Sequence, residues 1–227
     1  AISIAGTEGG LRGPHWINNR SLGTLSWKQE HIEAEVEKVW YDMNSGRYRN
    51  NDVLITGHSL GGNQASIFAY ALLSKIYSEN ERALRGAHGT DLPPVDQGLD
   101  PENDAHRRII EAARAKTAED ARRLHLITWN GLGGHEALNR LYPPSEDGHY
   151  NPSKHYDPTL FHLTGSIEHI RARGDMVSRL SDHVGGHYDE SGRYNDHSVR
   201  HVLNNPEAGI FNRTVGRYWK TFSETHS

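Results

Sequence analysis

The chain has 227 residues, which is enough for one α/β domain with a full hydrophobic core but cramped for two. Its 25 basic and 29 acidic residues give a formal net charge of −4 without long runs of like charge, so neither a nucleic-acid groove nor a polybasic membrane patch is expected. Cysteine is absent, which excludes disulfides and thiolate chemistry. We expect residues 1–227 to form a single domain in which 78–123 are an insertion made of a loop and a helix.

The first elements are predicted to be a strand and a helix. Residues 1–5 have a strand pattern that stops in a glycine-rich turn, and residues 8–25 predict a loop. A capping box at 26–29 then opens a helix that ends near 44–46. Its buried face is marked by apolar residues at helical spacing: Ile32, Val36, Val39, Trp40 and Met43. Because the chain starts directly on a strand, we expect the sheet to lack the first strands of its fold.

The most informative stretch is a strand, a sharp turn and a helix centred on Ser59. Residues 52–56 are an apolar, β-branched run, and residues 57–61 form a Gly-x-Ser-x-Gly motif. The helix that follows over 63–76 has an apolar stripe at spacings of three and four, formed by Ala65, Phe68, Leu72 and Ile76. Such a turn leaves no room for side chains at its two glycines and pushes the serine out above the sheet edge. The alternative is a plain glycine turn whose serine only caps the helix.

Further strands and helices alternate along the rest of the chain. Residues 78–101 predict a long loop, and Asp100 with Pro101 predicts the start of a helix with Ile110, Ala113, Ala121 and Leu124 on one side. Strands are predicted at 124–129 and 166–172, with a short helix between them that ends at Pro143 and Pro144. This alternation indicates a mostly parallel central sheet flanked by helices, with its ligand site beyond the carboxyl ends of the strands. Four polar residues fall at such ends: Thr7, Ser59, Asn130 and Asp175.

A serine at this turn becomes a nucleophile only with a general base that a third group orients. The acid is predicted to be Asp175, which follows a strand across a glycine turn, although it could instead cap a helix. The base should come after the acid, and His197 is our choice, with His183 and His187 left open as alternatives.

Two preorganised donors are needed for the oxyanion that forms during acyl transfer. The turn itself places the backbone N–H of Leu60. Thr7, in the loop after the first strand, could supply the second through its backbone N–H and its hydroxyl, or it could belong to an ordinary turn.

The chain resembles the class 3 (fungal-lipase-like) lipase family of the α/β-hydrolase superfamily, and in particular a bacterial member. The resemblance is carried by residues 4–7, 16–19, 57–62, 128–131 and 174–180. It implies an α/β-hydrolase fold, secretion, no cofactor, and hydrolysis of carboxylic ester bonds in acylglycerols or phospholipids at a membrane surface. It also implies the nucleophile, acid and oxyanion roles given above, with a downstream histidine as the base. The family usually has Asn and Pro where this chain has Gly174 and Ser178.

We therefore predict a serine carboxylester hydrolase of lipase or phospholipase A type that works through an acyl-enzyme. Two alternatives are kept: a small-ester esterase or thioesterase, and a non-catalytic domain that binds a lipid or a partner on a hydrolase scaffold. A zinc site at the histidine pairs 183/187 and 197/201 is not expected, because two glycines interrupt the first pair and no glutamate accompanies either pair as in a metalloprotease helix.

Overall fold

The structure is a computed structural model that describes residues 1–4, 29–45, 48–88, 92–172, 182–188, 194–195 and 199–202. For residues 29–31, 88, 172, 187–188, 194–195 and 199–202 the description is limited to the backbone.

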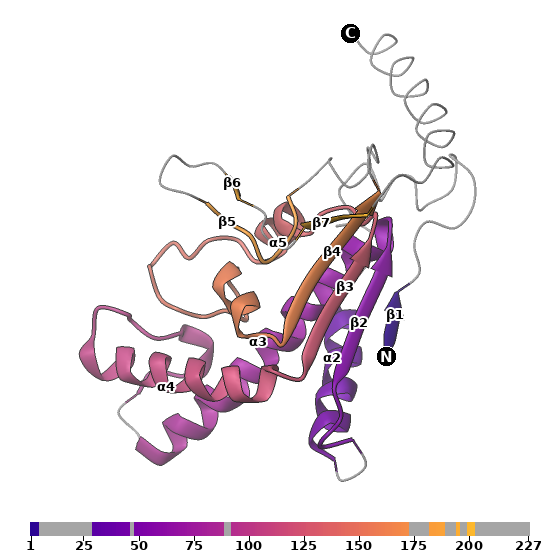
Figure 1. The fold of residues 1–227 in the computed structure, drawn as a ribbon. Helices are drawn as coiled ribbons and strands as arrows, with labels where there is room; N and C mark the ends of the chain where they lie inside the picture. Colours follow the sequence, from indigo (N-terminus) through magenta and orange to yellow (C-terminus); the bar gives the residue numbers. More distant parts are fainter. Residues whose placement is uncertain are drawn as a thin grey trace, which may run out of the picture.

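Strands and helices alternate through the described chain, as the sequence predicts, which confirms an α/β protein (Figure 1). The elements are β1 (Ile2–Ile4), α2 (Gln29–Asn44), β2 (Val53–His58), α3 (Leu60–His88), η1 (Val95–Gln97), α4 (Asp104–Ala121), β3 (Leu124–Trp129), α5 (His135–Leu141), η2 (Pro158–Leu163), β4 (Ser166–Ala172), β5 (His187–Tyr188), β6 (Tyr194–Asn195) and β7 (Val199–Val202).

The central sheet has five parallel strands in the order β1-β2-β3-β4-β7. Strand β1 is the outermost strand on its side of this sheet within the described residues. The short strands β5 and β6 form a separate antiparallel pair. All arrowheads of the central strands point towards the end of the molecule where α5 and the β5–β6 pair lie, whereas α4 lies near the start of the strands (Figure 1). The carboxyl ends of β2, β3 and β4 therefore meet at one edge, as a parallel sheet requires.

The hydrophobic core lies between the sheet and α3, and α2, which packs against α3, contributes its buried residues to the same core. The predicted stripe of the helix after Ser59 is confirmed, because its four apolar residues are all buried: Ala65, Phe68, Leu72 and Ile76. They face the inward side chains of β2 and β3, among them Ile55 and Leu126. The predicted inner face of α2 is likewise buried at Ile32, Val36 and Met43.

The prediction of a loop from residue 78 was wrong over 78–88, because α3 continues to His88. The buried face of this part of the helix is polar. Glu81 and Arg85, only 3% and 7% exposed, form an ion pair one turn apart in which Arg85 Nε donates to Glu81 Oε1 at 2.7 Å. Arg85 also donates to the carbonyl of Pro93, which holds the segment after the helix. Paired charges replace apolar residues here, so the hydrophobic periodicity stops before the helix does.

The start of α4 also differs from the prediction. Asn103 is the N-cap, and its Oδ1 accepts hydrogen bonds from the backbone N–H groups of Ala105 at 2.9 Å and His106 at 3.3 Å. Asp100 instead closes a turn, in which its Oδ1 accepts from the N–H of Glu102 at 2.8 Å. The inner face predicted for this helix is confirmed at Ile110, Ala113 and Ala121, whereas Leu124 begins β3.

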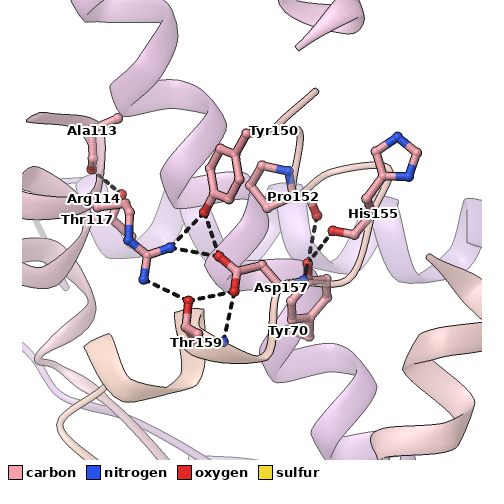
Figure 2. Close-up of polar contacts among 9 residues, drawn as sticks. All are labelled: Tyr70, Ala113, Arg114, Thr117, Tyr150, Pro152, His155, Asp157 and Thr159. Carbon is pink, nitrogen blue, oxygen red and sulfur yellow. Dashed lines mark hydrogen bonds and ion pairs between the residues drawn. The ribbon is translucent and has the colours of Figure 1, made fainter. Parts of the chain in front are cut away.

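A polar cluster around Asp157 fixes the long segment between α5 and β4 (Figure 2). Asp157 Oδ2 accepts hydrogen bonds from Arg114 Nη1 at 2.7 Å and from the Tyr150 hydroxyl at 2.6 Å. Its Oδ1 accepts from the N–H and hydroxyl of Thr159, and its own N–H donates to the Tyr70 hydroxyl at 2.9 Å. Burial raises the pKa of Asp157, but these donors and the guanidinium charge outweigh burial and hold the pKa below its ordinary value. Helix α4 is thereby tied to the Asp157 carboxylate through Arg114, and helix α3 to the Asp157 backbone N–H through Tyr70.

Candidate active site

Ser59 lies in a sharp turn between β2 and α3, as predicted, and its φ of 55° is in the left-handed region. That conformation is unfavourable for a non-glycine residue and persists only where surrounding contacts impose it. Three backbone hydrogen bonds do so here. The N–H of Ser59 donates to the Trp129 carbonyl at 3.2 Å, and the Ser59 carbonyl accepts from the N–H groups of Gly62 and Leu132, both at 3.0 Å.

Close backbone contacts explain the glycines of this turn. A Cβ added at Gly57 would lie 2.1 Å from the carbonyl oxygen of Gly61, so strand and helix approach too closely for any side chain at this position. A Cβ at Gly62 would lie 2.6 Å from Cα of Gly131, which follows β3. The prediction that Gly57 has no room for a side chain is confirmed. The turn also packs closely against the residues that follow β3.

The loop after β3 is fixed to the first turns of α3. Asn130 has a φ of 44°, and its N–H donates to the Ile170 carbonyl of β4 at 2.8 Å. The buried Asn63 side chain donates from Nδ2 to the Gly133 carbonyl at 2.6 Å. The ends of β2, β3 and β4 are therefore linked by hydrogen bonds into one continuous edge around the turn.

The backbone N–H of Leu60, the predicted first oxyanion donor, belongs to the first residue of α3. The first N–H groups of a helix have no carbonyl one turn back to bond with, and the helix dipole favours negative charge near them. This position suits a donor to an oxyanion next to Ser59, and the oxyanion role of Leu60 stays a prediction.

Three of the predicted site residues lie outside the described residues: Thr7, Asp175 and His197. Their roles as second oxyanion donor, acid and base stay predictions. Of the two alternative bases, His187 begins β5, where only the backbone is described. His183 is described and is 3% exposed.

A buried histidine that the sequence analysis did not single out lies beside this edge. His169 of β4 is 1% exposed, and its ring stacks at 4.5 Å on that of His183 with an interplanar angle of 31°. Its Nε2 lies 3.0 Å from the Val184 carbonyl, and its Nδ1 lies 2.8 Å from the Thr128 hydroxyl of β3. A carbonyl only accepts, so Nε2 carries the proton and Nδ1 accepts from Thr128.

The electrostatics of this cluster keep the ring neutral. Burial, followed by the neighbouring His183, lowers the pKa of His169 to about 3. The only sequence signal for this cluster is a histidine within a strand, and it becomes informative only once the register places Thr128 opposite His169.

In the described part of the chain, no three His, Asp or Glu side chains are grouped so that they could hold a metal ion. The described helices include none that is both long and apolar enough to cross a membrane.

Comparison with known families finds one relationship. The model of the family described as Lipase (class 3) matches residues 14–87, which include α2, β2, the Ser59 turn and nearly all of α3. Searches of curated proteins and of solved structures found no match. The match, over about a third of the chain, supports a relationship to the class 3 lipases and, with it, the hydrolysis of carboxylic esters of lipids as the general activity.

Proposed function

We propose that this protein is a serine carboxylester hydrolase of the α/β-hydrolase fold that cleaves lipid esters, as a lipase or phospholipase A, through an acyl-enzyme on Ser59. The observation that carries the proposal is the φ of 55° at Ser59, in a turn between a buried parallel strand and the N-terminus of α3. This backbone conformation is costly and is typical of a serine that must be held out above a sheet as a nucleophile. The family match over residues 14–87 includes this turn and supports the same chemistry.

The proposed reaction uses the roles predicted from the sequence. The Ser59 hydroxyl attacks the ester carbonyl while His197 takes its proton, and the N–H groups of Leu60 and Thr7 bind the oxyanion. The protonated imidazole then returns the proton to the leaving alcohol, and Asp175 holds the imidazole in the required tautomer. Water repeats the sequence on the acyl-enzyme and releases the acid. Among the alternative bases, the burial of His183 against His169 favours a structural role for His183.

A fluorophosphonate probe tests the nucleophile directly. Wild-type protein should be labelled once per chain at Ser59 and should hydrolyse p-nitrophenyl esters, whereas Ser59→Ala should do neither and keep its far-ultraviolet circular dichroism. Ser66→Ala is the matched control, because Ser66 lies in α3 with its hydroxyl donated to the Gly62 carbonyl at 3.0 Å. Turnover by Ser59→Ala, or labelling at any other residue, would disprove the assignment and leave a non-catalytic binding domain as the alternative.

Single replacements identify the base. His197→Ala should lose ester turnover, while His187→Ala should retain it; His183→Ala should lower stability, because His183 is buried against His169, but the folded protein should retain turnover. Full activity of His197→Ala would transfer the role to whichever of the other two variants is inactive.

The substrate class follows from a profile of purified protein on short-chain esters, long-chain acylglycerols and phospholipids. A lipase or phospholipase should prefer the long-chain or phospholipid substrates. A preference for short chains would instead assign a small-ester esterase, and rapid cleavage of acyl thioesters would assign a thioesterase.

A further inference from the structure

We propose that His169 is a positioning residue that ties residues 182–186 to the Ser59 turn. Residues 182–186 lie between the proposed acid and the proposed base in the chain, so this inference rests on the proposed function. His169 is buried in β4 and takes no part in the reaction described above.

On one side, His169 is connected to the turn through Thr128. The Thr128 hydroxyl donates to His169 Nδ1 at 2.8 Å. Thr128 lies next to Gly62 and Gly131, the two glycines at which the turn contacts the end of β3. A Cβ built on Gly131 would be 3.1 Å from Oγ1 of Thr128, and a Cβ built on Gly62 would be 3.4 Å from Cβ of Thr128. The orientation of the Thr128 side chain therefore affects the packing beneath Ser59.

On the other side, His169 holds the segment that follows the proposed acid. Its Nε2–H donates to the carbonyl of the fully buried Val184 at 3.0 Å, and its ring stacks on His183. The same segment is anchored two residues earlier to α5, where the N–H of His135 donates to the Asp182 carbonyl and the N–H of Asp182 donates to Glu136 Oε1, each at 3.1 Å. Two anchors so close together fix the direction in which the chain enters β5.

A neutral imidazole is the one side chain that offers an acceptor and a donor from a single rigid ring at these two positions. Because burial lowers the pKa of His169 to about 3, the ring is neutral around neutral pH and keeps both roles. The amide side chains of Asn and Gln each reproduce one of these two hydrogen-bonding roles. Asn at this position would place its oxygen near Nδ1, and Gln would place its NH₂ near Nε2.

The test compares His169→Asn with His169→Gln. His169→Asn keeps the acceptor for Thr128 but loses the donor to Val184, so kcat on p-nitrophenyl esters should fall roughly 10- to 100-fold with KM changed by less than about threefold, as expected for a misplaced catalytic group. The rate of fluorophosphonate labelling should fall by the same factor. His169→Gln keeps the bond to Val184 and should keep kcat within about fivefold of wild type. A wild-type kcat in His169→Asn, or an equal loss in both variants, would overturn the proposal.

Three further variants, at two positions, separate positioning from a general loss of stability. Thr117→Val removes a buried hydroxyl that donates to the Ala113 carbonyl at 2.7 Å in α4, so it should lower stability without lowering kcat. Thr128→Val removes the hydrogen bond that His169→Gln also removes, so it should lower kcat by a similar factor of no more than about fivefold, and Thr128→Ser should restore kcat, even if the His169 variants do not fold. A drop in kcat in Thr117→Val equal to that in Thr128→Val would refute a specific role.

Amide hydrogen exchange distinguishes the failure of this inference from the failure of the proposed function. In His169→Asn the amides of residues 182–186 should exchange faster than in His169→Gln, while those of β2 should be equal in both. If wild-type protein shows neither labelling nor ester turnover, the proposed function fails, and the exchange rates still decide whether His169 holds the segment. Equal exchange of the amides of residues 182–186 in the two variants would refute the proposal that His169 holds this segment.

Discussion

Mild acidification should destabilise the protein through His169, and the sign follows from its burial. In the unfolded chain this histidine has an ordinary pKa near 6.5, whereas in the folded chain burial and His183 lower the pKa to about 3. Between these two values the unfolded state binds more protons than the folded state. Stability is therefore complete above the unfolded pKa and is lost as the pH falls below it, until the folded pKa is reached.

The size of the effect can be worked out for a change from about pH 7.5 to about pH 5. Each pH unit below the unfolded pKa costs about 1.36 kcal/mol for one group, so roughly one and a half units cost about 2 kcal/mol. The whole interval lies above the folded pKa, so the result depends mainly on the unfolded value. Asp157, whose pKa is lowered, remains ionised throughout and does not contribute.

Urea unfolding at both pH values measures this contribution when wild type is compared with His169→Gln. His135, whose pKa is also lowered by burial, contributes with the same sign, but it does so in both proteins and cancels in the comparison. The loss of unfolding free energy should be about 2 kcal/mol larger in wild type than in the variant. Equal losses in the two proteins would show that His169 is not held neutral in the fold and would refute the reasoning.

Predictions for four other substitutions follow from the described contacts. Gly57→Ala should abolish ester turnover because of its clash with Gly61, whereas Gly86→Ala, in open space on α3, should stabilise the protein by roughly 0.5–1 kcal/mol in thermal unfolding. Asp157→Asn should lower the urea unfolding free energy by about 2–4 kcal/mol, since it removes one partner of a largely buried ion pair. Tyr70→Phe should cost about 1–3 kcal/mol in the same assay, because buried backbone groups lose their partner.

The strand, turn and helix around Ser59 could be predicted because every determinant is local. The β-branched run of β2, the glycines of the turn and the apolar stripe of α3 lie within about one helix length of one another, and each favours the same structure. The second half of α3 could not be predicted in this way. Beyond Tyr77 its buried positions are the ion pair Glu81 and Arg85, and hydrophobic periodicity does not detect a buried face that is made of paired charges.

The buried histidine cluster could not be predicted for a different reason. Thr128 and His169 are 41 residues apart and become partners only through the register of β3 on β4. Val184 joins them from a third segment, which follows β4 in the chain. A sequence gives strand positions but not their register, so side-chain pairs between strands are not visible in it. The roles of Thr7, Asp175 and His197 stay predictions.

The unfavourable backbone conformation of Ser59 is held in place by hydrogen bonds from the neighbouring strands β3 and β4. Ser59 and Asn130 both have positive φ, a conformation that costs on the order of 1–3 kcal/mol at a non-glycine residue. The N–H of Ser59 is held by the carbonyl of Trp129 at the end of β3, and the N–H of Asn130 is held by the carbonyl of Ile170 in β4. Strand β4 thus supports the end of β3, which supports Ser59.

His169 lies in β4 directly before Ile170, so its two side-chain hydrogen bonds act on the same strand that supports this chain of contacts. A change in β4 can therefore alter the geometry at Ser59 without touching it, because interior packing transmits small displacements rather than absorbing them. Asp157 is bonded to Arg114 of α4, and α4 lies near the start of the strands, away from their carboxyl ends (Figure 1). By the same reasoning, substitutions around Asp157 should change stability more than they change the turnover of a folded molecule.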